Sequence, residues 1–141
     1  MFMGEFQHTV DAKGRLIIPA KFRDGLGERF IATRGLENCL FVFSEKEWAL
    51  FGDKLKQLPL ASGAARQFNR LLFSGATECE LDPQGRINLP ANLREYAAIE
   101  KEAVVVGVSS RVEIWAKDRW AEYCKKAEES FADTAEKLLD I

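Results

Sequence analysis

The chain has 141 residues, of which 47% are hydrophobic, and its 20 basic residues nearly balance its 22 acidic residues. This length and composition favour one compact domain and leave little room for two independent cores. The net charge of -2 excludes the overall basic excess that is typical of nucleic-acid-binding proteins. A DNA-binding surface would therefore depend on local charge, which is basic up to Gly35 and acidic from Ala116 onward.

The cysteine and hydropathy patterns exclude further classes of protein. Cys39, Cys79 and Cys124 are odd in number and widely separated, so we expect packed free thiols rather than a disulfide framework. The single His8 completes no recognisable zinc-binding spacing with them. No segment approaches the roughly 20 apolar residues of a membrane span, and no signal peptide opens the chain. We therefore expect a soluble, cytoplasmic protein without a membrane partner.

A strand followed by a tight turn is expected near the N-terminus. The strand covers residues 5–10, and Asp11 and Gly14 then take the first and fourth positions of a type I turn. Gly14 is expected to adopt a positive φ in a bulge, so that the strands before and after the turn pair as a hairpin. Pro19 fits the first turn of a short helix that follows.

The rest of the first half is expected to contain two apolar strands and two helices. Ser44 followed by Glu47 is a capping box, which predicts a helix from there to about Leu58. A break over residues 59–63 precedes another predicted helix over residues 64–73. The apolar runs that predict strands in the whole chain are residues 30–32, 39–43, 103–108 and 112–115, and a last amphipathic helix is expected from about residue 117.

The segment around the turn is repeated once. Residues 82–94 align with residues 11–23 without a gap at an offset of 71 residues, and Asp, Gly, Arg, Pro, Ala and Arg are identical in both copies. Asp82 and Gly85 therefore repeat the predicted turn. The expected divisions are residues 1–58 for the first repeat with its C-terminal helix, 59–75 for a helical linker, 76–131 for the second repeat with its C-terminal helix, and 132–141 for an acidic, frayed tail.

The sequence contains no recognisable catalytic set. It has a single histidine, no GxSxG motif and no glycine-rich phosphate loop, and its acidic residues fit exposed faces of amphipathic helices. We expect neither an enzyme nor a bound cofactor or metal.

The residues with an unusual position lie at and beside the two turns. Lys13 and Gln84 occupy matching tip positions, and Arg15 and Arg86 directly follow the turn glycines. The short helices beside the turns add Lys21, Arg23 and Arg94. A two-stranded ribbon fits the major groove of DNA, where Arg or Lys bonds guanine and Gln or Asn bonds adenine. These seven residues are the candidate DNA-binding set.

A purely structural interpretation of the same positions stays open. Asp11 and Arg15, and likewise Asp82 and Arg86, have the spacing to pair across the turn and hold it together. The two tip side chains would then be solvated. An exposed pair of this kind stabilises a protein by only about 0–1 kcal/mol, which is a weak reason to repeat it.

The aromatic residues also allow two interpretations. They could stack on bases, as in proteins that bind single strands. Their alternation along strands and their helical spacing favour packing in a core or between subunits. The residues concerned are Phe41, Phe43, Trp48, Trp115 and Trp120.

The motif D-x-x-G-R-x-x-x-P-A-x-x-R, present twice, resembles the SpoVT/AbrB superfamily, and its tandem arrangement from Met1 to about Phe131 resembles the MraZ family. The resemblance implies an α+β fold in which two swapped-hairpin β-α-β halves close one double-split β-barrel with flanking helices. It also implies a sequence-specific transcription factor at repeated sites upstream of its own operon, the division and cell-wall gene cluster. Double-stranded DNA in the nucleoid and a ring-shaped homo-oligomer would be its partners.

Carried over to this chain, the family's DxxxR motif falls on Asp11 with Arg15 and on Asp82 with Arg86. The basic DNA-facing surface would include Lys13, Arg15, Lys21 and Arg23. The second copy departs from it with Gln84 and Asn92, so we expect it to bind phosphate more weakly. An antitoxin-like protein-interaction module with the same barrel fold is the alternative function.

Overall fold

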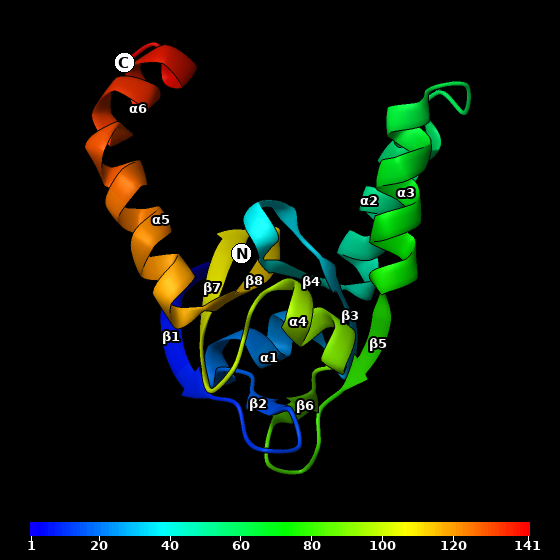
Figure 1. The fold of residues 1–141 in the computed structure, drawn as a ribbon, viewed down its shortest axis with the longest axis vertical. Helices are drawn as coiled ribbons and strands as arrows, with labels where there is room; N and C mark the ends of the chain where they lie inside the picture. Colours follow the sequence, from blue (N-terminus) through cyan, green and yellow to red (C-terminus); the bar gives the residue numbers. More distant parts are fainter.

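The computed structural model describes residues 1–141 as a mixed α+β fold, as expected from the sequence. The strands are β1 (Phe2–Thr9), β2 (Arg15–Ile17), β3 (Arg29–Arg34), β4 (Leu40–Ser44), β5 (Thr77–Glu80), β6 (Arg86–Asn88), β7 (Glu102–Ser109) and β8 (Arg111–Ala116). The α-helices are α1 (Ala20–Leu26), α2 (Glu45–Lys56), α3 (Gly63–Gly75), α4 (Ala91–Tyr96), α5 (Lys117–Glu129) and α6 (Phe131–Leu139), with one 3-10 turn over Leu36–Asn38. Figure 1 shows β2 and β6 at one end of the molecule and the helical arms α2–α3 and α5–α6 at the other.

The two copies interleave in an antiparallel sheet. Its six strands have the order β1-β7-β8-β4-β3-β5, while β2 and β6 form a separate two-stranded ribbon. Because β5 to β8 repeat β1 to β4, this order reads the same from either edge when the copies are exchanged. Each copy supplies an edge strand to the other, since β1 pairs with β7 and β5 pairs with β3. The edge strands β1 and β5 do not pair with each other, so this sheet is open.

The predicted hairpins are wrong in their pairing, although the turns are present. The strands before and after the first turn, β1 and β2, lie in different sheets, and so do β5 and β6. The physical reason is burial: β2 and β6 pair with each other, with Leu16 opposite Ile87, and both side chains are almost inaccessible to solvent. A strand of three residues gains more stability by burying this apolar pair than by forming backbone hydrogen bonds with the preceding strand.

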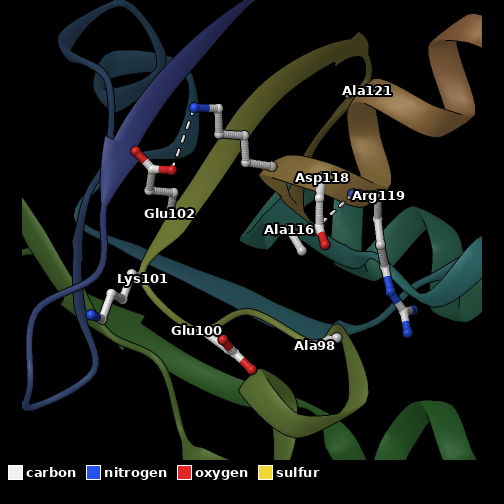
Figure 2. Close-up of a pocket in the computed structure, with 9 residues that line it drawn as sticks. Ala98, Glu100, Lys101, Glu102, Ala116, Asp118, Arg119 and Ala121 are labelled. Carbon is white, nitrogen blue, oxygen red and sulfur yellow. Dashed lines mark hydrogen bonds and ion pairs between the residues drawn. The ribbon is translucent and has the colours of Figure 1, made fainter.

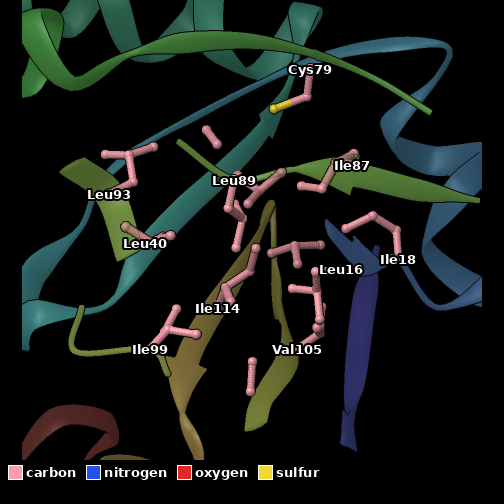
Figure 3. Close-up of a cluster of buried hydrophobic side chains, with 14 of the residues drawn as sticks. Leu16, Ile18, Leu40, Cys79, Ile87, Leu89, Leu93, Ile99, Val105 and Ile114 are labelled. Carbon is pink, nitrogen blue, oxygen red and sulfur yellow. The ribbon is translucent and has the colours of Figure 1, made fainter. Parts of the chain in front are cut away.

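The main core lies between the inner face of the sheet, the ribbon and the short helices α1 and α4. Figure 3 shows side chains from the ribbon converging with sheet residues such as Val105 and Ile114. Both copies contribute equivalent residues to this one cluster, including Phe22 of α1 and Leu93 of α4. The two copies therefore share the main core instead of each forming its own.

The outer face of the sheet carries a smaller aromatic cluster beneath the helical arms. Phe41, Phe43 and Trp115 are buried there, and Trp48 of α2 and Trp120 of α5 pack against them. The ring centroids of Phe43 and Trp48 are 5.8 Å apart, and those of Trp115 and Trp120 are 5.2 Å apart. The prediction that these aromatic residues form packing contacts is confirmed.

Local signals placed most elements within a few residues of their observed bounds. The Ser44 hydroxyl caps α2 by accepting a hydrogen bond from the Glu47 backbone N–H at 3.2 Å. Pro19 and Pro90 directly precede α1 and α4 instead of lying in their first turns. Cys39 and Cys79 are buried and Cys124 is partly buried, and all three are free thiols. None of the helices combines the length and the apolar character required to cross a membrane.

Candidate nucleic-acid interface

The first turn is organised around the carboxylate of Asp11. Its Oδ1 accepts hydrogen bonds from the backbone N–H groups of Lys13 at 3.0 Å and Arg15 at 2.9 Å. Its Oδ2 accepts a third from the Arg15 side chain, with Nε 2.7 Å away. The Gly14 N–H donates to the Asp11 carbonyl, and Gly14 has a φ of 80°. The predicted four-residue turn and the positive φ at its glycine are therefore confirmed.

The second turn repeats these bonds. The Asp82 carboxylate accepts from the backbone of Gln84 at 2.9 Å, from the backbone of Arg86 at 2.8 Å and from Arg86 Nε at 2.7 Å. Gly85 has a φ of 78°. In addition, Arg86 Nη1 lies 3.9 Å from Asp11 Oδ2, which adds an ion pair between the two copies.

Hydrogen bonding lowers the pKa of both turn carboxylates. For Asp11, the backbone N–H of Arg15 contributes most to the lowered pKa, followed among the stabilising groups by the Arg15 side chain and the Lys13 N–H. The pKa of Asp82 is lowered in the same way, by the backbone N–H and side chain of Arg86 and by the backbone N–H of Gln84. Partial desolvation acts in the opposite direction but is outweighed. Both groups stay ionised at neutral pH and hold their arginines in a fixed orientation.

Each turn is also locked to the other copy. The carbonyl of Gly85 accepts a hydrogen bond from the Ile18 N–H, and the carbonyl of Gly14 accepts one from the Leu89 N–H, both at 2.9 Å. A Cβ on Gly14 would lie 2.9 Å from Cζ of Arg94, and a Cβ on Gly85 would overlap the guanidinium of Arg23. Glycine adopts the positive φ at low cost, and its lack of a Cβ leaves the arginine side chain in its place.

Arg23 and Arg94 therefore have a structural role that the sequence did not reveal. Arg23 Nε donates to the Ile18 carbonyl at 2.8 Å, and Arg94 Nε donates to the Leu89 carbonyl at 3.0 Å. Both side chains are partly buried against the turn of the opposite copy. Each guanidinium brings positive charge to the base of a turn while bracing it.

The predicted site residues meet at one end of the molecule because the copies interlock there (Figure 1). Lys13 and Gln84 are exposed at the two tips, and Lys21 is exposed on α1. The Arg15 and Arg86 side chains are 34% and 24% exposed, although the Nε of each is bonded to an aspartate. Arginine has five N–H donors, and four of them are on the terminal nitrogens. The structural pairing and an outward-facing role are thus compatible in the same side chain.

Two further residues on this surface were missed in the sequence. Ile17 and Asn88 occupy equivalent positions in β2 and β6, directly opposite Arg86 and Arg15 respectively. Side chains at alternate positions share one face of a strand, so both lie on the outer face with the arginines. The alternation from Arg15 to Ile17 was the available signal, but it could be interpreted only once the facing strand was known.

Elsewhere on the surface, a broad hollow of about 530 Å³ separates the end of α4 from the start of α5. Figure 2 shows its lining, which consists of alanines and side chains of both charges, with Lys117 paired to Glu102 at 3.4 Å. The lining contains no Ser, Cys or His that could act as a nucleophile or base. This arrangement is that of a solvated, charge-balanced surface.

Comparison with known proteins places the chain in a family. A family profile described as "MraZ protein, putative antitoxin-like" matches twice, over residues 1–71 and 72–141. A protein of Symbiobacterium thermophilum is 68% identical over 136 residues, covering 96% of this chain and 99% of its own length. Proteins of Desulforamulus reducens and Natranaerobius thermophilus are 62% and 57% identical over 141 residues, covering all of this chain and 99% of their own lengths. All three are named "Transcriptional regulator MraZ".

The names of these relatives define a class, that of transcriptional regulators rather than enzymes. The two profile matches meet between residues 71 and 72, which agrees with the offset of 71 residues between the turn motifs. The chain belongs to the MraZ family.

Proposed function

We propose that the chain regulates transcription by binding double-stranded DNA sequence-specifically through the ribbon β2–β6 and its two turns. The observation that carries the proposal is the fixed orientation of Arg15 and Arg86. Each has Nε bonded to an aspartate, which leaves most of its terminal N–H groups without a partner in the protein, on a ribbon narrow enough for the major groove. Arginine held in this way can donate two hydrogen bonds to one guanine with little loss of side-chain entropy on binding.

The other predicted residues divide into two roles. Lys13 and Lys21 are exposed and their ammonium groups make no hydrogen bond or ion pair within the protein, so they suit contacts with DNA phosphates. Arg23 and Arg94 brace the turns, and their charge attracts the backbone at short range. The second copy has Gln84 and Asn92 where the first has Lys13 and Lys21, so the first copy should dominate binding to phosphate.

The proposal extends to assembly and architecture. Helix α6 exposes Phe131, Leu138 and Leu139, and such apolar side chains favour contact with another subunit. We propose a ring-shaped homo-oligomer, which would present several weak DNA contacts together at repeated sites upstream of its own operon. In this view the open sheet and the ribbon act as one double-split barrel, built from repeats at residues 1–58 and 76–131.

An electrophoretic shift assay tests this function directly. The full chain is titrated into a duplex from the promoter of its own operon, and into a scrambled duplex of the same length and composition. We expect a shift of the promoter at protein concentrations at least tenfold lower than for the scrambled duplex. Equal affinity for the two duplexes, or no shift of either, would contradict the proposal.

Exchanging the tip residues tests the proposed division between the copies. Lys13→Gln should weaken binding to all sequences and reduce the slope of log affinity against log salt by about 0.9 for each phosphate that the variant no longer neutralises. Gln84→Lys should steepen it by a similar amount, while the double exchange restores the original slope. Lys46→Gln is the matched control, since Lys46 is exposed on α2, which Figure 1 shows away from the ribbon β2–β6. If Lys13→Gln leaves the salt dependence of the affinity unchanged, Lys13 does not contact a phosphate.

The antitoxin-like alternative has one observation in its favour, since the apolar residues of α6 would also suit a protein partner. The same assay separates the functions, because a protein-interaction module would not distinguish the promoter from the scrambled duplex.

A further inference from the structure

The outer face of the ribbon β2–β6 carries two equivalent arginines, but the side chains opposite them differ. Arg15 lies opposite Asn88, and Arg86 lies opposite Ile17, with the buried pair Leu16 and Ile87 between the two. Directly opposed side chains in an antiparallel pair have Cβ atoms about 4.5–5.5 Å apart. The face is therefore two adjoining units, an arginine beside an amide and an arginine beside an aliphatic side chain.

Burial explains which positions agree between the copies. In the aligned turn segments, the buried or partly buried positions hold identical or similarly apolar residues in both copies, including the aspartates, glycines and arginines. The positions exposed in both copies differ except at Ala20 and Ala91. The differing exposed pairs are Ala12 and Pro83, Lys13 and Gln84, Ile17 and Asn88, and Lys21 and Asn92. Of these, only Ile17 and Asn88 lie within the ribbon itself.

Strand preference favours isoleucine at Ile17, but it does not explain why Ile17 and Asn88 are exposed on the outer face. Ile17 is 36% exposed, although an aliphatic residue of its size would gain stability from burial. The amide of Asn88 is exposed and takes part in no hydrogen bond within the protein. Asparagine is also disfavoured in strands. Both are therefore free to contact a ligand that covers the ribbon.

We propose that Ile17 and Asn88 are specificity-determining residues, which make the pseudo-symmetric ribbon read a non-palindromic DNA sequence in one orientation. The inference rests on the DNA-binding function proposed above. Beside Arg15, the Asn88 amide can donate to N7 of adenine and accept from the adenine N6 amino group. Beside Arg86, Ile17 offers an apolar surface for the methyl group of thymine and no hydrogen bond. One unit thus selects guanine next to adenine, and the other selects guanine next to thymine.

The test uses a pool of duplex DNA with a randomised central segment, from which the full-length protein selects its binding sequences. The unchanged protein should enrich a non-palindromic motif. Ile17→Asn makes both units Arg with Asn, so its motif should become palindromic at the inner positions and lose preference for thymine there. Asn88→Ile should do the reverse and replace adenine preference by thymine preference. Each change of preferred base should be roughly 5- to 150-fold in relative affinity.

Controls keep a folding defect apart from a change in specificity. Leu60→Asn alters an exposed aliphatic residue in the α2–α3 connection, 83% exposed, and should leave the motif unchanged. Thermal melting verifies the fold of each variant, and Ile17→Gln, whose amide can also bond adenine, replaces Ile17→Asn if that variant unfolds. If the ribbon variants enrich the same motif as the unchanged protein, this inference is wrong but the DNA-binding proposal stands. Failure of the unchanged protein to enrich any motif would overturn the DNA-binding proposal and this inference together.

Discussion

The two turns of this protein are nearly identical in their internal bonds and different in the side chains that they expose. The three bonds to Asp11 measure 3.0, 2.9 and 2.7 Å, and those to Asp82 measure 2.9, 2.8 and 2.7 Å. At the tips, however, Lys13 corresponds to Gln84. The comparison teaches that the main role of the Asp, Gly and Arg shared by both copies is to form the turn. Function can then differ between the copies because the exposed positions are not needed to form it.

The largest effect should come from removing one copy altogether. In a fragment of residues 1–58, β1 would lose its partner β7, β2 would lose β6 and β3 would lose β5. So short a chain buries too little apolar surface to offset its conformational entropy. We expect no folded monomer, and either aggregation or a dimer in which a second first copy replaces the missing one. Ultracentrifugation and thermal denaturation distinguish these states, and a cooperatively melting monomer would show that the copies are independent domains.

Replacing Gly14 or Gly85 by valine should destabilise the protein, and the two variants should be affected to a similar degree. Gly14→Val and Gly85→Val each place a β-branched residue at a φ near 80° and press its Cβ against an arginine of the other copy. We expect the free energy of unfolding to fall by about 2 kcal/mol or more in each variant. Gly52→Val is the matched control, because a Cβ there meets nothing within 4 Å and valine favours a helix more than glycine does. Urea denaturation measures all three, and a neutral Gly14→Val would contradict the strained-turn argument.

Replacing each turn arginine should show that the first turn contributes more to DNA affinity than the second. Arg15→Ala should reduce specific DNA affinity by about 1–3 kcal/mol, the value of one bidentate bond to guanine, while the turn persists on the two backbone bonds to Asp11. Arg86→Ala should have a smaller effect, because Arg86 is less exposed and also faces Asp11. Titration of the promoter duplex by fluorescence anisotropy compares the variants. Arg15→Lys serves as the control for charge, since it keeps the cation but loses the planar fork; normal affinity of a folded Arg15→Ala would refute the proposed contact.

The smallest effect should appear on acidification and should be alike in both turns. The pKa values of Asp11 and Asp82 are lowered from an ordinary value of 3.8 by hydrogen bonding in the folded protein. A lowered pKa stabilises the fold above the unfolded value, and this contribution is lost as the pH falls through the folded value. Asp11→Asn and Asp82→Asn should therefore lose stability less steeply below about pH 4 than the unchanged protein. Urea titrations between neutral pH and about pH 2.5 measure this, and equal acid dependence in all three proteins would exclude the two aspartates as its cause.

Local sequence determined the turns, their positive φ values, the helix cap at Ser44 and most element positions. These features depend on interactions within a few residues, such as the bonds that the Asp11 carboxylate accepts from the N–H groups of Lys13 and Arg15. The repeat likewise revealed that Asp82, Gly85 and Arg86 would form a second copy of the first turn. For the same reason the arginines following the glycines could be singled out before any fold was known.

Tertiary structure alone decided which strands pair and which side chains face outward. The expected pairing of neighbouring strands gave way to pairing between copies, because that arrangement buries Leu16 against Ile87. Contacts between positions about 70 residues apart depend on which chain arrangement buries the most apolar surface, and no short motif encodes this. The bracing of Gly85 by Arg23 and of Gly14 by Arg94, and the outward placement of Ile17 and Asn88, follow from that interlock and from nothing local in the chain.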